Sequence, residues 1–120
     1  MKEAYHIEEG EKLACMIALG YGKTQGASHK IKTIEQVSNA TGDSPLWFRK
    51  GVEAALLAPT AINQQKFSFL LQSQESPGVG GKAKVLAKKG FSMVGYTQMD
   101  LGIAKLHFEI GAGTENFEWE

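Results

Sequence analysis

The chain has 120 residues, 42% of which are hydrophobic, and its formal net charge is zero. This length fits one small domain or part of a larger protein, with enough apolar residues for a core. Zero net charge argues against a nucleic-acid partner, because such binding needs an excess of lysine and arginine. The single cysteine, Cys15, excludes an intrachain disulfide and favours a reducing, cytoplasmic location.

The first third of the chain predicts a strand followed by a basic loop. The apolar run at residues 12–19 favours a buried strand that ends at the glycines of residues 20–22, with Cys15 as a small core residue. This run is too short to span a bilayer, and nothing near the start resembles a signal peptide, so we expect no membrane contact. The loop that follows contains Lys30 and Lys32.

A helix is predicted after the Asp43-Ser44-Pro45 segment. Asp43 or Ser44 can cap free amides, and the fixed φ of Pro45 suits a first helical turn. Apolar residues then recur at helical spacing until Pro59, which cannot continue the helix. The residues expected on the buried face are Phe48, Val52, Ala55 and Leu56.

A polar loop at residues 58–65 joins this helix to a predicted strand at residues 66–71, where aromatic residues alternate with other side chains. The loop offers one hydroxyl, from Thr60, and three carboxamides, each both a donor and an acceptor. Such groups can form hydrogen bonds with the polar atoms along the edge of a flat, neutral heterocycle. The alternative for Asn63 and Gln65 is ordinary turn chemistry, and for Thr60 a local bond to the backbone.

The last third predicts a hairpin, a helix and a docked tail. Residues 72–82 are expected to form a flexible connection, and residues 85–87 and 91–94 to pair as two short strands. A final helix is expected at residues 99–110, with Thr97 and Asp100 in a capping arrangement. The tail is expected to dock through its two aromatic residues, Phe117 and Trp119.

Other side chains that could carry chemistry have simpler explanations. His107 lies on an apolar stretch of the final helix and is expected to be a hydrogen-bonded core residue. Met16, Met93 and Met99 are expected to fill the core. The acidic residues near His6 lack a second pair of ligands at metal spacing, so no metal site is predicted.

The polar loop resembles the flavin-contacting loop of the nitroreductase family, usually written Ala-Pro-Ser-x-x-Asn-x-Gln-Pro. The matching residues here are Ala58, Pro59, Thr60, Asn63 and Gln65, with Lys66 in place of the second proline. The resemblance implies an α+β fold with a mainly antiparallel sheet packed with helices. It also implies reduction of nitroaromatics or quinones through flavin mononucleotide (FMN), with NAD(P)H as electron donor. The flavin carries the hydride in such enzymes, so no catalytic side chain is expected.

The resemblance also assigns site residues. Lys30 and Lys32 match two basic residues that meet the flavin phosphate in the family. The flavin contacts on the other side would come from Pro59, Thr60, Ala61 and Asn63, and Gln65 is assigned to the same site.

The order of these elements resembles the C-terminal part of an internally duplicated nitroreductase, because the late element precedes the early one. The resemblance therefore implies a partial, half fold, with residues 1–33 closing a first half and residues 43–120 forming an abbreviated second half. A homo-oligomer or a complementing N-terminal half would complete the flavin site. The alternative is a non-catalytic flavin-binding or assembly module. It is favoured by the missing arginine-rich segment, which holds the flavin phosphate in the family.

Overall fold

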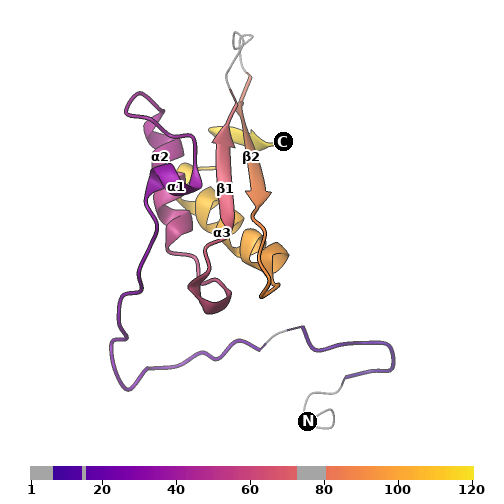
Figure 1. The fold of residues 1–120 in the computed structure, drawn as a ribbon. Helices are drawn as coiled ribbons and strands as arrows, with labels where there is room; N and C mark the ends of the chain where they lie inside the picture. Colours follow the sequence, from indigo (N-terminus) through magenta and orange to yellow (C-terminus); the bar gives the residue numbers. More distant parts are fainter. Residues whose placement is uncertain (1–6, 15, 73–80) are drawn as a thin grey trace.

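The computed structural model describes residues 7–14, 16–72 and 81–120, and it divides them into an arm and a body (Figure 1). The arm consists of residues 7–14 and 16–33, which form no helix or strand and run away from the body. The radius of gyration is 17.4 Å, compared with about 14 Å for a compact chain of this length. The expected burial of Cys15 and the expected flexible connection at 73–80 lie outside the described residues.

The body is an α+β unit. Its elements in chain order are α1 (Ile34–Val37), α2 (Leu46–Leu56), η2 (Ala61–Asn63), β1 (Phe67–Leu71), β2 (Ala83–Lys89), α3 (Thr97–Ala112) and β3 (Phe117–Trp119). Within the described residues the sheet has three strands in the order β1-β2-β3. β1 and β2 are antiparallel, whereas β2 and β3 are parallel, so the sheet is mixed.

The core lies between the sheet and the two long helices. α2 and α3 pack against each other, and α3 also contacts β1 and β2 (Figure 1). All four residues predicted for the buried face of α2 are buried. Phe108 of α3 is fully buried, with its ring centroid 4.7 Å from that of Phe69 and 5.2 Å from that of Phe117. The predicted docking of the aromatic tail is confirmed, because Phe117 is buried and Trp119 packs on the core.

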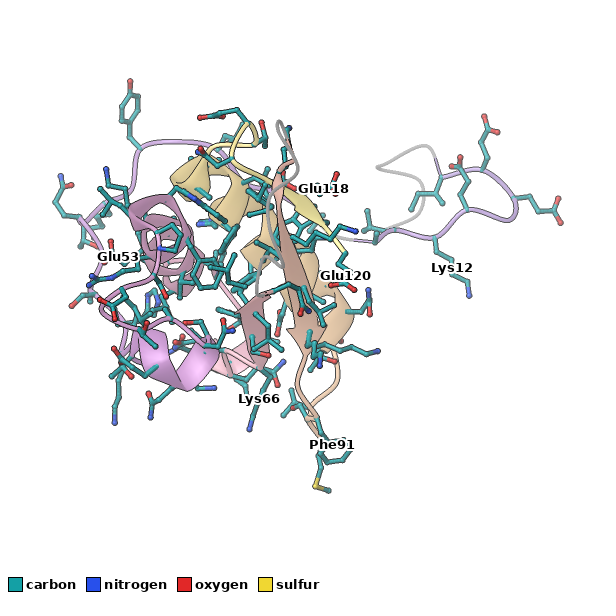
Figure 2. The ribbon with its side chains drawn as sticks, turned by 90° about the horizontal axis from the view of Figure 1, so that it is seen from above. Lys12, Glu53, Lys66, Phe91, Glu118 and Glu120 are labelled. Carbon is teal, nitrogen blue, oxygen red and sulfur yellow. The ribbon has the colours of Figure 1, made fainter. Side chains whose placement is uncertain are left out.

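The strand predicted at residues 12–19 is wrong. These residues lie in the arm, where Ile17 is 82% exposed and Leu19 94% exposed. A strand needs neighbouring backbone to satisfy its N–H and C=O groups, and the arm has no hydrogen-bonded strand beside it in the described part of the chain. Figure 2 shows Lys12 on this arm, well outside the body.

The hairpin predicted around residues 88–90 is also wrong. β2 pairs with β1 in a register that places Phe67 opposite Lys89, and residues 91–94 form no strand. β1 pairs with β2 from Val85 to Lys89, whereas β3 pairs with the other edge only at Ala83–Val85. Phe91 projects from the body at this end (Figure 2) and is 86% exposed.

Two capping predictions and one core prediction are corrected by the structure. Pro45, not a polar residue, occupies the N-cap of α2, and Ser44 Oγ instead accepts from the Thr41 N–H. Asp100 does not cap α3, which follows the left-handed residue Tyr96. The three methionines predicted to fill the core are exposed instead. Met16 lies on the arm and is 62% exposed, Met93 lies on the loop after β2 and is 94% exposed, and Met99 lies on the outer side of α3 and is 47% exposed.

Replacing either of two glycines on α3 with alanine should change the free energy of unfolding, in opposite directions. A Cβ on Gly111 would lie 2.5 Å from the Lys50 carbonyl oxygen and 2.6 Å from the Ala54 Cβ, so Gly111→Ala forces α2 and α3 apart. We expect it to lower the free energy of unfolding by about 1–2 kcal/mol. Gly102→Ala meets nothing within 4 Å and should raise that free energy by about 0.5–1 kcal/mol. Urea unfolding of both variants measures these changes. If both variants changed the free energy of unfolding in the same direction, the close contact between α2 and α3 at Gly111 would be contradicted.

Candidate functional site

The polar loop at residues 58–65 has a strained backbone. Ile62, Asn63 and Gln65 have positive φ angles of 46°, 55° and 46°. Asn tolerates this region, but a β-branched residue such as Ile62 is a genuine outlier there. Such a conformation costs of the order of 1–3 kcal/mol per residue and persists only where surrounding contacts fix it. The contacts that fix this loop come from two sides.

On the first side, the carboxamides of Asn63 and Gln65 hold the root of the arm; we call this pair the carboxamide clamp. Gln65 Oε1 accepts from the Lys32 N–H at 2.9 Å, and Gln65 Nε2 donates to the Lys30 carbonyl at 2.8 Å. Asn63 Nδ2 donates to the same carbonyl at 2.8 Å, and its Oδ1 accepts from Gln65 Nε2 at 2.7 Å. The clamp therefore fixes the backbone of the segment that carries both lysines.

Two further bonds tie the clamp to its neighbours. The Gln65 N–H donates to Thr60 Oγ1 at 3.0 Å, which uses the Thr60 hydroxyl as an acceptor within the loop. Lys32 Nζ donates to the Gln65 carbonyl at 2.6 Å. Within the described residues, every hydrogen bond that joins residues 7–32 to the body runs to Asn63 or Gln65. Gln65 is only 3% exposed, which makes it the centre of this junction.

On the second side, Asp100 of α3 holds the loop. Its Oδ1 accepts from the Ala61 N–H at 3.0 Å, and its Oδ2 accepts from Gln64 Nε2 at 2.6 Å. Asp100 is 3% exposed. The sequence analysis missed this role. The available signal was an acidic residue placed next to Leu101 and four residues before Ala104, on the side of the helix that carries the buried apolar residues.

The clamp and the lysine segment line a shallow hollow of about 320 Å³, whose lining residues are Lys30, Ile31, Lys32, Gln36, Asn63 and Gln65. Lys30 is exposed. Burial, and then the positive charge of Lys66, lower the pKa of Lys32 from its usual value. An anion bound between the two ammonium groups would oppose the effect of Lys66, because it favours the charged form.

The structure therefore brings four of the seven predicted site residues to one hollow: Lys30, Lys32, Asn63 and Gln65. Thr60 does not line the hollow, but its Oγ1 accepts from the Gln65 N–H and so helps to position Gln65. Pro59 is exposed on the same loop, and Ala61 contributes its N–H to Asp100, so neither lines the hollow. Most of the hydrogen-bonding capacity of the Asn63 and Gln65 carboxamides is used on the arm. The donors left for a ligand are the Lys30 ammonium group and the protons of the Lys32 ammonium group that do not bond the Gln65 carbonyl.

Other chemistry is sparse in the described ranges. They contain no group of three His, Cys, Asp or Glu side chains that could hold a metal ion. His107 is half-buried, with Nδ1 3.3 Å from the Ala54 carbonyl oxygen, as a hydrogen-bonded histidine at the edge of the core should be. None of the helices in this part of the chain combines the length and apolar character needed to cross a membrane.

The α+β body is compatible with part of a nitroreductase-like fold. Residues 1–112 match the family described as "Putative TM nitroreductase", and the chain belongs to this family. No curated protein and no solved structure matches the chain.

Proposed function

We propose that this chain provides part of an FMN site and takes part in the reduction of nitroaromatics or quinones by NAD(P)H. Lys30 and Lys32 bind the phosphate, and the loop with Pro59, Thr60, Ala61 and Asn63 faces the flavin ring. When bound, the flavin supplies the hydride chemistry, and the protein supplies position and hydrogen bonds. The observation that carries this proposal is the hollow in which both lysines lie beside the clamp.

The residues present fit the phosphate end of this cofactor. Two lysines, two positions apart on a segment whose backbone is fixed by Gln65, provide charged donors with little ordering cost on binding. The outer part of the loop presents exposed apolar surface at Pro59 and Ile62, which suits a flat ring.

The size of the hollow supports a shared site. Ligand pockets usually enclose about 300–1,000 Å³, and this hollow has about 320 Å³. It is large enough for the phosphate and the adjoining chain, but the ring would need a further surface. A second copy or a preceding half of a longer protein would provide it.

A titration of the full chain with FMN, followed by flavin fluorescence, tests the proposal. Lys30→Ala and Lys32→Ala should each weaken binding by about 10–100-fold, because a charged hydrogen bond contributes about 1.5–3 kcal/mol. Lys88→Ala is the matched control, since Lys88 is an exposed lysine on β2. A wild-type chain that binds no FMN as purified, or equal loss in all three variants, would overturn the lysine assignment.

A turnover assay separates the enzyme from the alternative. NAD(P)H oxidation that depends on both FMN and a nitroaromatic or quinone would establish the oxidoreductase. Stable FMN binding without such oxidation would identify a non-catalytic flavin-binding or assembly module. The exposed arm favours an assembly module. Its extended apolar segment is better suited to contact a protein partner than to bind a substrate.

A further inference from the structure

The loop between β2 and α3 exposes apolar side chains to solvent. Phe91 is 86% exposed, Met93 94%, Val94 45% and Tyr96 65%, and we call these residues the apolar tip. Figure 2 shows Phe91 projecting from the body at this end. Single exposed apolar residues are ordinary on a protein surface, but several together on one short loop mark a surface that contacts something apolar.

The backbone of this loop is held in place. Gly95 and Tyr96 have φ angles of 81° and 58°, and this left-handed conformation is unfavourable for a residue such as Tyr96. The Gly95 carbonyl accepts from Gln64 Nε2 at 3.0 Å. The Tyr96 carbonyl accepts from the Asp100 N–H at 2.9 Å. These bonds fix the end of the loop next to α3, so contact with a partner requires less ordering of the chain.

Three exposed lysines stand at the base of the tip, and we call them the lysine collar: Lys66, Lys88 and Lys89. The Gly90 N–H donates to the Lys66 carbonyl at 2.7 Å, so Lys66 lies beside the start of the loop. Lys88 and Lys89 end β2 and, as neighbours in a strand, point to opposite faces of the sheet. The collar therefore places positive charge on both sides of the base of the tip.

The sequence around the tip and the collar has no acidic residue. Residues 54–72 and 82–99 contain neither Asp nor Glu. The next acid, Asp100, is 3% exposed, and its carboxylate oxygens accept hydrogen bonds from the polar loop. Glu118 and Glu120 lie away from Phe91 (Figure 2), because β3 pairs with the first residues of β2. A chain without net charge thus has one end that is both apolar and basic.

We propose that the apolar tip and the lysine collar bind the surface of an anionic lipid bilayer. The apolar side chains enter the boundary between headgroups and acyl chains, about 5–10 Å deep. The lysines stay at the level of the negatively charged headgroups. Tyr96 suits this boundary, because its ring is apolar and its hydroxyl can remain in water. Stable attachment of this kind needs two contributions, and the tip and the collar supply one each.

The shape of the loop favours a bilayer over an acidic protein. A protein partner would need a hollow complementary to a projecting loop, whereas a fluid bilayer adapts to it. The expectation of no membrane contact rested on the lack of a spanning segment or signal peptide, and a loop that lies in the bilayer surface needs neither. The inference does not depend on flavin binding.

Co-sedimentation of the full chain with lipid vesicles, without flavin, tests the inference. Phosphatidylcholine vesicles that contain about one third phosphatidylserine should bind the chain at about 0.05 M salt, and binding should fall steeply at about 0.5 M salt. Vesicles of phosphatidylcholine alone should bind it at least about tenfold less tightly, because the collar then has no anionic headgroups to attract it.

Variants assign the contact to the tip and the collar. Phe91→Ser and Met93→Ser should each weaken binding at least about fivefold, because each removes apolar surface that enters the bilayer. Lys89→Gln should weaken binding about fivefold at low salt and much less at high salt. Leu46→Ser, at a 65% exposed apolar position on α2, and Lys50→Gln, at an exposed lysine of the same helix, are the matched controls and should bind as the wild type does.

Three results would each overturn the inference. The first is no binding to the phosphatidylserine vesicles at low salt, which would favour an acidic protein as the partner of this end. The second is equal binding to both kinds of vesicle, or equal loss in the controls. The third is binding that survives Phe91→Ser and Met93→Ser but is lost with Ile17→Ser, which would assign the contact to the arm. Circular dichroism shows whether each variant is folded, as expected for exposed positions.

Discussion

Replacing Phe108 with alanine should lower the free energy of unfolding by about 3–5 kcal/mol, the usual cost of emptying a fully buried aromatic position. The Phe108 ring lies within 6 Å, between centroids, of those of Phe48, Phe69, Phe117 and Trp119, so it joins α2, both outer strands and α3 in one cluster. Urea unfolding followed by tryptophan fluorescence measures the loss.

Leu106→Ala is the matched control for this prediction. Leu106 lies on the same helix but on its exposed side, so its truncation should change the unfolding free energy by less than about 0.5 kcal/mol as long as the chain is monomeric. The measurement should therefore be made at low protein concentration. A cost below about 1 kcal/mol for Phe108→Ala would contradict the proposed centre of the core.

Replacing Gln65 with alanine should release the arm from the body. The change removes the acceptor of the Lys32 N–H and one of the two donors to the Lys30 carbonyl. The Lys30 carbonyl keeps its bond from Asn63 Nδ2, so only the Lys32 N–H loses its partner. Leaving one such group unpaired costs about 1–3 kcal/mol, and we expect the free energy of unfolding to fall by that amount. Hydrogen exchange of the Lys32 amide, followed by NMR, should accelerate more than that of amides in β1.

Two further variants make the Gln65 prediction specific. Gln65→Glu keeps an oxygen for the Lys32 N–H but cannot donate to the Lys30 carbonyl, so its effect should lie between those of wild type and alanine. Gln36→Ala is the control, because Gln36 also lines the hollow but its side chain accepts from the Thr33 N–H, three residues earlier, and not from the arm residues Lys30 or Lys32. Unchanged exchange at Lys32 in Gln65→Ala would show that the clamp does not hold the arm.

The parts of the fold that were predicted correctly depend on local patterns. The buried face of α2 and the alternation in β1 follow from side-chain periodicity alone, and α3 was predicted with ends within two residues of those observed. The polar loop was predicted because Pro59 must end α2 before β1 begins. In each case the relevant residues are neighbours in the chain, so the signal is present in a short stretch of sequence.

The errors arose where a residue's partner is distant. The apolar run at residues 12–19 has the composition of a buried strand, but composition does not provide a sheet edge to pair with. The hairpin of residues 85–87 with residues 91–94 was predicted from the turn signal at residues 88–90, whereas β2 pairs with β1, which precedes it in the chain. Asp100 was assigned to a helix cap because its partners, Ala61 and Gln64, lie more than 35 residues away.

The sequence alone determined the residue types of the candidate site: two lysines two positions apart, and a hydroxyl and carboxamides on a loop between a helix and a strand. Only the tertiary structure decided what those groups do. The clamp joins residues more than 30 positions apart, and it turns Asn63 and Gln65 inward to the backbone of Lys30 and Lys32. Hydrogen bonds between distant segments form when packing brings the segments together, and a linear pattern of residue types does not encode that meeting.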